Sequence, residues 1–392
     1  MAAQSDWLDV VHTGPGTLAG RYMRMFWHPV YRSKDLGAGQ AVPIRIMSED
    51  LTLFRGETGQ PHIVAGRCGH RGTRLSTGWV EDDCIRCLYH GWRYDGSGQC
   101  VEQPGEDESF AAKVRLKSYP AVEYLGHVFT YMGPDPAPPL RRYPDFERPG
   151  LLEVGPVEAW PCNYFNRIDN AADAGHVPWT HRTAITRSGK ADRLAVRNVS
   201  AEETEYGVRT ASRVASGPPE YLHFHMPNVN QVRSQVMMEG SLADAASMWA
   251  DRMFWRVPVD DDNSVSFEVE LVHLSGPAAA AYQQRREQSG ELPSAELNAV
   301  AEEVLAGKRR IQQTPDDFST YKLFLVEDYA TQVGQGAVAD RENEHLGRID
   351  SGLIMVRRVW QRELRALAEG LPLTDWREPD GVADMHRVAA VS

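Results

Sequence analysis

The sequence is short of cysteine, of basic residues and of long apolar runs, and each shortage excludes a class of protein. Only five of its 392 residues are cysteines, an odd number that does not suit a disulfide-rich secreted scaffold. Acidic residues outnumber basic ones by 54 to 42, giving a net charge of −12 that argues against a nucleic-acid binder. No apolar run approaches the roughly 20 residues of a membrane span, and the N-terminus lacks the basic-then-apolar order of a signal peptide. We therefore expect a cytoplasmic protein that binds neither nucleic acid nor membrane.

The chain length fits two domains, and a proline-rich segment at residues 133–139 marks the boundary between them. We expect an N-terminal segment at residues 1–26, a strand-rich domain at residues 27–134 and a second domain at residues 135–392. The second domain carries strand patterns at residues 195–198, 207–214, 231–238 and 264–274. Helical patterns cover residues 162–179, 278–310, 320–329 and a last helix from Ser351 to a stop at Gly370. This mixture predicts an α+β fold.

Cysteine and histidine cluster in the first domain at metal-binding spacing. The sequence contains Cys68-x-His70 and, after sixteen intervening residues, Cys87-x₂-His90. Zinc sites prefer to pair like with like, whereas each half here offers one thiolate and one imidazole. That division suits a two-iron cluster in which thiolates hold one iron and imidazoles hold the other. A zinc ribbon is the alternative, and Cys84 is a rival ligand because it forms Cys84-x₂-Cys87.

This string resembles the Rieske [2Fe–2S] domain, whose signature is C-x-H followed by C-x₂-H. The resemblance implies that the cluster ligands are Cys68, His70, Cys87 and His90, and it leaves Cys84 out as a buried thiol. We expect Tyr89 to donate a hydrogen bond to a ligand sulfur and Trp92 to shield the cluster from water.

A second constellation lies at residues 170–181, where Asn170, Asp173 and His176 are spaced three apart. On one helix they would share a face. Pro178 would end or bend that helix and let His181 turn back toward His176. Two histidines and a carboxylate form the facial triad of mononuclear non-haem Fe(II), which leaves positions open for O₂ and substrate.

The same string is similar to the N-x-x-D-x-x-H-x₄-H pattern of the Rieske non-haem iron oxygenases. The resemblance implies that His176 and His181 ligate iron and that Asn170 lies beside it. Asp173 would then bridge a cluster histidine of one subunit and an iron histidine of its neighbour. The third iron ligand would come from a late Glu-Asp pair, which makes Asp328 the first candidate. The next candidates are Glu327 and Asp316, which could instead belong to a solvated helix face.

The resemblance also implies a fold and an activity. The fold would be an antiparallel Rieske domain followed by a helix-grip (START-like) domain with a curved antiparallel sheet. The single-chain layout resembles the phthalate-dioxygenase-like branch of aromatic ring-hydroxylating α subunits. Members of that branch use O₂ for cis-dihydroxylation, monohydroxylation or oxidative demethylation of aromatic carboxylates and aryl ethers, in aromatic catabolism. A Rieske protein confined to electron transfer and a zinc-binding interaction module are the alternative functions.

The resemblance implies partners as well. The sequence has no Gly-x-Gly-x-x-Gly fingerprint for flavin or nicotinamide, so we expect a separate NAD(P)H-dependent reductase of flavin or ferredoxin type. Arginines around the cluster motif could dock an acidic donor or merely balance local carboxylates: Arg67, Arg71, Arg74, Arg86 and Arg93. Electron transfer between subunits implies a homotrimer or stacked trimers.

The residues that line the substrate pocket carry no motif of their own. The pocket walls should come from the catalytic sheet and its neighbours, where aromatic and polar residues mix: Tyr221, His223, Phe224, His225, Asn228, Asn230, Met237, Trp249, Phe254 and Trp255. An arginine could clamp a substrate carboxylate or form a structural salt bridge: Arg233, Arg252 or Arg256.

Overall fold

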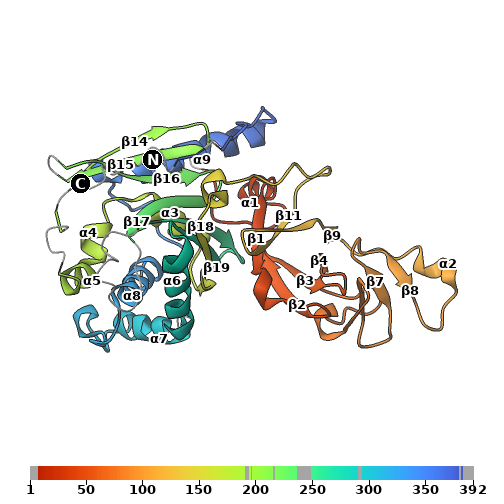
Figure 1. Ribbon diagram of the computed structural model, residues 1–392. Coiled ribbons are helices and arrows are strands. Elements are labelled where there is room, and N and C mark those ends of the chain that lie inside the picture. The colour runs from red at the N-terminus through yellow and green to blue at the C-terminus, as the bar shows by residue number, and fades with distance from the viewer. Residues whose placement is uncertain are drawn as a thin grey trace. The chain divides into compact units, whose positions relative to one another are not determined.

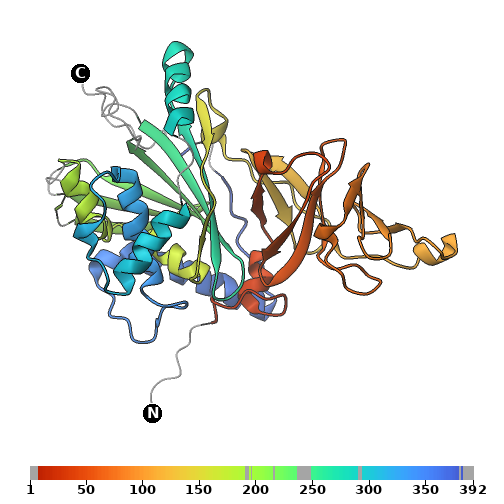
Figure 2. The same ribbon diagram turned by 90° about the horizontal axis from the view of Figure 1, so that it is seen from below.

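The computed structural model (Figures 1 and 2) describes residues 8–189, 194–195, 197–214, 217–235, 249–289, 294–378 and 381–382. The chain divides into two compact units. The N-terminal unit consists of residues 12–141 together with residues 257–261, and the C-terminal unit contains the rest of the chain. Within the described ranges, every helix is too short or too polar to cross a lipid bilayer.

The N-terminal unit is built from small antiparallel sheets with the strand orders β1-β11-β10, β2-β3-β4-β9 and β5-β6-β7-β8. The strands are β1 (Trp27–Arg32), β2 (Ala41–Ile46), β3 (Glu49–Arg55), β4 (Pro61–Ala65), β5 (Trp79–Glu81), β6 (Cys84–Arg86), β7 (Arg93–Asp95), β8 (Cys100–Glu102), β9 (Ser118–Tyr119), β10 (Ala121–Tyr124) and β11 (His127–Tyr131). Two short helices accompany them, α1 (Leu18–Met23) and α2 (Glu108–Ala111).

The core of this unit lies directly beneath the cysteine motif. Phe54 on β3, Ile85 on β6 and Tyr94 on β7 are fully buried in one cluster that also contains Cys68 and Cys87. Short strands joined by tight turns thus hold two loops over an apolar base, which excludes water from the thiol side of the motif.

The C-terminal unit contains one large antiparallel sheet, ordered β12-β19-β18-β17-β16-β15-β14, with β13 also pairing with β19. Its strands are β12 (Leu151–Val154), β13 (Glu158–Trp160), β14 (Arg197–Glu203), β15 (Gly207–Val214), β16 (Glu220–His225), β17 (Val229–Gln235), β18 (Trp249–Pro258) and β19 (Ser264–Val272). Its helices are α3 (Tyr164–Ala172), α4 (Val177–Thr180), α5 (Arg182–Arg187), α6 (Gly276–Ser289), α7 (Ser294–Leu305), α8 (Thr320–Val333) and α9 (Ser351–Glu369).

One face of this sheet is covered by α3 and α8. Arg167 on α3 donates to Glu158 on β13, and Tyr321 on α8 accepts from Arg252 on β18. Because alternate residues of a strand point to opposite faces, Phe254 and Arg256 lie on the same face as Arg252. We call it the inner face.

The last helix follows its sequence pattern closely. It begins at Ser351 and ends where Gly370 adopts a left-handed conformation with φ of 68°. Gly352 at its start permits close approach to the end of α3, because a Cβ there would lie 2.2 Å from the carbonyl oxygen of Ala172. The start of α9 therefore packs closely against the end of α3.

Candidate iron site and cluster site

Three side chains converge beside the inner face. The ligand atoms of His176, His181 and Asp328 all lie within 4.8 Å of one another. The His181 Nε2 and Asp328 Oδ1 atoms are 3.6 Å apart. His176 immediately precedes α4, His181 lies between α4 and α5, and Asp328 is on α8. Two imidazoles and one carboxylate make the donor set that suits a mononuclear Fe(II) ion.

The backbone achieves this convergence by a different route from the one predicted. The helix α3 ends at Ala172, Asp173 is extended with φ of −93° and ψ of 107°, and a new short helix follows His176. The prediction that Asn170, Asp173 and His176 share one helical face is therefore wrong. Pro178 lies in the first turn of α4, where its missing N–H costs nothing, so it starts a helix instead of ending one.

Each histidine has an oxygen partner at Nδ1. The His176 Nδ1 donates to the carbonyl oxygen of Asp173 at 2.6 Å. The His181 Nδ1 lies 3.3 Å from Glu327 Oε2. Such bonds fix the tautomer that a metal requires. Burial lowers the pKa of His176, which favours the neutral ring that binds metals.

The late acidic residues have three different environments. The Asp328 Oδ1 atom accepts from Asn170 Nδ2 at 3.4 Å and from Gln332 Nε2 at 3.2 Å. Glu327 is 1% exposed, so the alternative of a solvated helix face is wrong for it. Asp316 is fully exposed and lies 3.7 Å from Arg187, away from the three converging side chains. Of the three acids, Asp328 alone joins both histidines.

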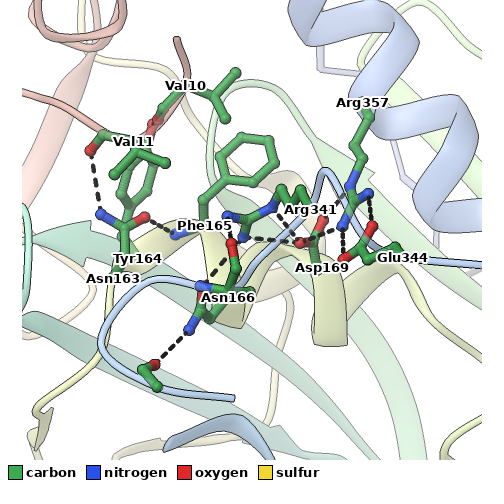
Figure 3. Close-up of polar contacts among 12 residues, drawn as sticks. Val10, Val11, Asn163, Tyr164, Phe165, Asn166, Asp169, Arg341, Glu344 and Arg357 are labelled. Atoms are coloured by element: carbon green, nitrogen blue, oxygen red, sulfur yellow. Dashed lines mark hydrogen bonds and ion pairs between the residues drawn. The ribbon is translucent and has the colours of Figure 1, made fainter. Parts of the chain in front are cut away.

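A buried ionic network holds α3 in position (Figure 3). The Asp169 carboxylate accepts from Arg357 at 2.8 and 2.7 Å and from Arg341 at 3.0 Å. Arg357 also pairs with Glu344, and Asn166 accepts from Arg341 at 3.1 Å. Two arginines and two acids balance one another and tie α3 to α9 and to the segment between α8 and α9.

The cysteine motif places its four side chains in two distinct environments. Cys68 and Cys87 are buried at 4% and 1% exposure, whereas His70 and His90 are exposed. The two imidazole rings are 4.5 Å apart between centroids, and Trp92 stacks on His70 at 4.5 Å. Buried thiolates and exposed imidazoles are the arrangement that a Rieske cluster requires, and the four donors fit it.

The hydrogen bond to sulfur comes from Tyr94 instead of Tyr89. The Tyr94 hydroxyl lies 3.3 Å from Cys68 Sγ and accepts the Gly69 N–H at 3.1 Å, so its own proton is available to a thiolate sulfur. Burial raises the pKa of Tyr94, which keeps it a donor. Tyr89 is 54% exposed and accepts from Arg71, so the prediction for Tyr89 is wrong.

The arginines near the motif fall into two groups. Arg86 pairs with Glu81 and Glu102, and Arg93 pairs with Asp82, so these two balance local carboxylates. The others are exposed and have no carboxylate partner among the residues that the structure describes: Arg67, Arg71 and Arg74.

The strand register sorts the pocket candidates by face. Asn230 pairs with Phe254, and Asn228 donates to the Arg256 carbonyl oxygen, so both belong to the inner-face set. The opposite face carries Trp255. The strand register places three more of the candidates on that face: His223, His225 and Arg233.

Several of these side chains are already engaged. Arg233 makes a double hydrogen bond to Asp251, and His225 pairs with Glu378. On the inner face, Phe224 is buried, whereas Tyr221 on the opposite face stacks against Arg209. Met237 and the side chain of Trp249 lie outside the described residues. The register therefore favours Asn228 and Asn230 over the other three substrate residues named first, His225, Trp255 and Arg233.

Comparison with known proteins agrees with this geometry. The Rieske [2Fe-2S] domain family matches residues 26–120. The 5,5'-dehydrodivanillate O-demethylase oxygenase subunit of Sphingobium sp. is 27% identical over 383 residues, which cover 94% of this chain and 81% of that protein. The phenoxybenzoate dioxygenase subunit alpha of Ectopseudomonas oleovorans is 29% identical over 383 residues, covering 91% and 84%. The solved structure of Pseudomonas putida CBB5 NdmA has a TM-score of 0.65 at 18% identity, covering 90% of this chain and 94% of that one, and shows the fold alone.

Fold and sites together define an α+β oxygenase with an antiparallel Rieske domain and a catalytic domain made of a large antiparallel sheet and helices. The chain belongs to the Rieske non-haem iron ring-hydroxylating oxygenase α subunits, EC class 1.14, and is similar to the phthalate-dioxygenase-like members.

Proposed function

We propose that this oxygenase hydroxylates an aromatic carboxylate, with cis-dihydroxylation as the first reaction to test. The observation that carries the proposal is the convergence of His176, His181 and Asp328 beside an inner face that presents Arg256. Cys68, His70, Cys87 and His90 would hold the [2Fe–2S] cluster. The iron and the cluster, when bound, supply O₂ activation and electrons. The protein's own side chains must bind the substrate, orient it and exclude water.

Arg256 is the arginine best suited to hold a substrate carboxylate. It lies 3.9 Å from Glu158, but Arg167 already binds that same carboxylate at 2.6 Å. The Arg256 Nε is buried and has no hydrogen-bond partner among the described residues. Burial and the neighbouring Arg167 lower the pKa of Arg256 to about 10. Arg256 donates to Ser266 through Nη1, and a substrate carboxylate would give it the close acidic partner that Glu158, held by Arg167, does not.

The other two arginines are less suited. Arg252 is committed to Glu268 and Tyr321, and Arg233 is committed to Asp251 on the opposite face. We therefore assign the clamp to Arg256 alone among the three candidates.

The neighbours of Arg256 suit an aromatic ring with a polar substituent. Phe254 lies beneath the guanidinium, 4.8 Å from ring centroid to Cζ. Asn230, opposite Phe254, is 8% exposed, and its Oδ1 has no partner within the described part of the chain. An apolar ring flanked by an amide and a guanidinium would stack on the substrate and orient it through its polar groups.

Electrons would come from a separate flavin- or ferredoxin-type reductase. The Sphingobium relative is named an oxygenase subunit, which supports a multicomponent system. The exposed arginines Arg67, Arg71 and Arg74 would meet an acidic donor surface. We propose a homotrimer, single or stacked, in which Asp173 links the cluster of one subunit to the iron of the next.

Oxidative demethylation or monohydroxylation is the second candidate, because the Sphingobium relative is an O-demethylase. The two reactions differ in their products. The reconstituted protein with a surrogate NADH reductase would receive aromatic acids, aryl methyl ethers and neutral aromatics under ¹⁸O₂. Gain of two labelled oxygens and two hydrogens means dihydroxylation, and gain of one oxygen or release of formaldehyde means the second candidate.

The substrate class has its own test. Replacing Arg256 by Gln should raise KM for acids much more than for their primary amides, because only acids lose an ion pair. Equal effects on acids and amides, or no turnover of any acid by the wild type, would contradict the carboxylate assignment.

A further inference from the structure

We propose that Glu327 is the positioning residue for His181: its carboxylate holds the ring so that Nε2 is aimed at the iron site. This goes beyond the choice of iron ligands and rests on the proposed site at His176, His181 and Asp328.

Two neighbouring acids on α8 reach the same imidazole from different sides. Consecutive helix residues point about 100° apart. The Glu327 Oε2 lies 3.3 Å from Nδ1 of His181, while the Asp328 Oδ1 lies 3.6 Å from Nε2. Because a neutral imidazole carries one proton, a carboxylate at Nδ1 holds the proton there and leaves Nε2 as the ligand atom.

The second oxygen of Glu327 fixes the backbone that follows His181. Oε1 accepts the N–H of Thr183 at 3.1 Å and the N–H of Ala184 at 3.2 Å. Glu327 is 1% exposed, and these donors together with Nδ1 compensate its burial. One carboxylate thus fixes both the ring of His181 and the peptide segment that carries it.

Phe324 supplies the remaining constraint. Its ring stacks on His181 at 4.0 Å between centroids and 22° between planes. Stacking sets the plane of the imidazole but allows a half-turn about the Cβ–Cγ bond, which keeps that plane and exchanges the positions of the ring nitrogens and carbons. The Glu327 hydrogen bond removes this rotation, so the two contacts have separate roles.

The test measures metal binding independently of turnover. The Glu327→Gln side chain has nearly the same shape, but its amide cannot satisfy all three donors. If the Gln oxygen accepts the backbone N–H groups, the Gln NH₂ group faces Nδ1 of His181. That contact favours the tautomer with the proton on Nε2, and a protonated Nε2 cannot bind metal. Glu327→Asp keeps the charge and shortens the reach. The matched control is Asp316→Asn, which removes an exposed acid just before α8.

Each variant, with its [2Fe–2S] cluster intact, is titrated with Co(II) in place of iron. We expect Glu327→Gln to weaken Co(II) binding 10- to 100-fold and to change its visible ligand-field spectrum. The metal-free thermal midpoint and the cluster absorption should change far less, and Asp316→Asn should match the wild type. A wild-type Co(II) affinity and spectrum in Glu327→Gln would overturn the proposal.

Two further measurements keep the proposal testable if Glu327→Gln does not fold. In Co(II)-loaded wild-type protein, the Nδ1–H of His181 should give a shifted NMR signal that exchanges slowly with D₂O. Rapid exchange of that proton would overturn the proposal. The Asp328→Ala variant tests the iron site itself, independently of the role of Glu327. If it retains wild-type Co(II) affinity, the iron site itself is misplaced and the proposed function fails with it.

Discussion

Replacing Asp169 by Asn should destabilise the C-terminal unit by about 3 kcal/mol, because it leaves a buried positive charge without its partner. Asp169 is 8% exposed and accepts three hydrogen bonds of 2.7–3.0 Å from Arg357 and Arg341. Breaking a buried ion pair by removing one partner costs about 3–5 kcal/mol. The lower figure applies because Arg357 keeps Glu344 and the Asn amide keeps one acceptor oxygen.

The assay is denaturant unfolding followed by tryptophan fluorescence, with the visible absorption of the cluster recorded in parallel. The fluorescence midpoint should fall while the cluster transition stays in place, since the network lies wholly within the C-terminal unit. Asp340→Asn is the control: it removes an exposed acid next to Arg341 and should change stability by less than about 0.5 kcal/mol. A loss below about 1 kcal/mol for Asp169→Asn would refute the reasoning, because it would mean that water already compensates Arg341 and Arg357.

Three further predictions concern the cluster, acid stability and subunit coupling. Tyr94→Phe should lower the reduction potential of the cluster by tens of millivolts in a redox titration, since it removes the hydrogen bond to Cys68 that stabilises the reduced form; an unchanged potential would contradict it. Burial lowers the pKa of His28 and of His127 from 6.5 to about 4, so below pH 6.5 the unfolded chain takes up protons that the folded protein does not. The free energy of unfolding should therefore fall by about 2 kcal/mol per pH unit near pH 5. Replacing both by Gln should flatten that slope in denaturant midpoints. Asp173→Asn should retain both metals in elemental analysis yet lose nearly all turnover, and a variant keeping most of its activity would exclude the bridging role.

The motifs that could be predicted from the sequence are those whose residues are close together in the chain. The two Cys-His pairs and the string from Asn170 to His181 have spacing that indicates metal binding by itself. Asp328 lies far along the chain, and only a family resemblance connects it to His176. The geometry agrees with that choice because the fold brings α8 against α4 and α5.

The errors have identifiable physical causes. Tyr89 adjoins the ligand candidate His90 in the sequence, but strand alternation in β7 directs Tyr94 inward between Arg93 and Asp95. The break after Ala172 had a weaker signal, the small residues before His176. Which strand residues lie on the inner face could not be read from the sequence, because a one-residue shift in register exchanges the two faces.

The role of α8 shows why a ligand list alone is an incomplete account of such a site. Within two turns this helix provides Phe324, Glu327 and Asp328, and all three address His181 from different directions. A rigid helix fixes the angles between them, so the ring plane, the tautomer and the approach of the third ligand are set together. A loop carrying the same residues would leave each free to move alone. In our proposal the Glu-Asp pair therefore has two functions on one rigid element: the buried acid orients the ligand, and the less buried acid completes the metal site.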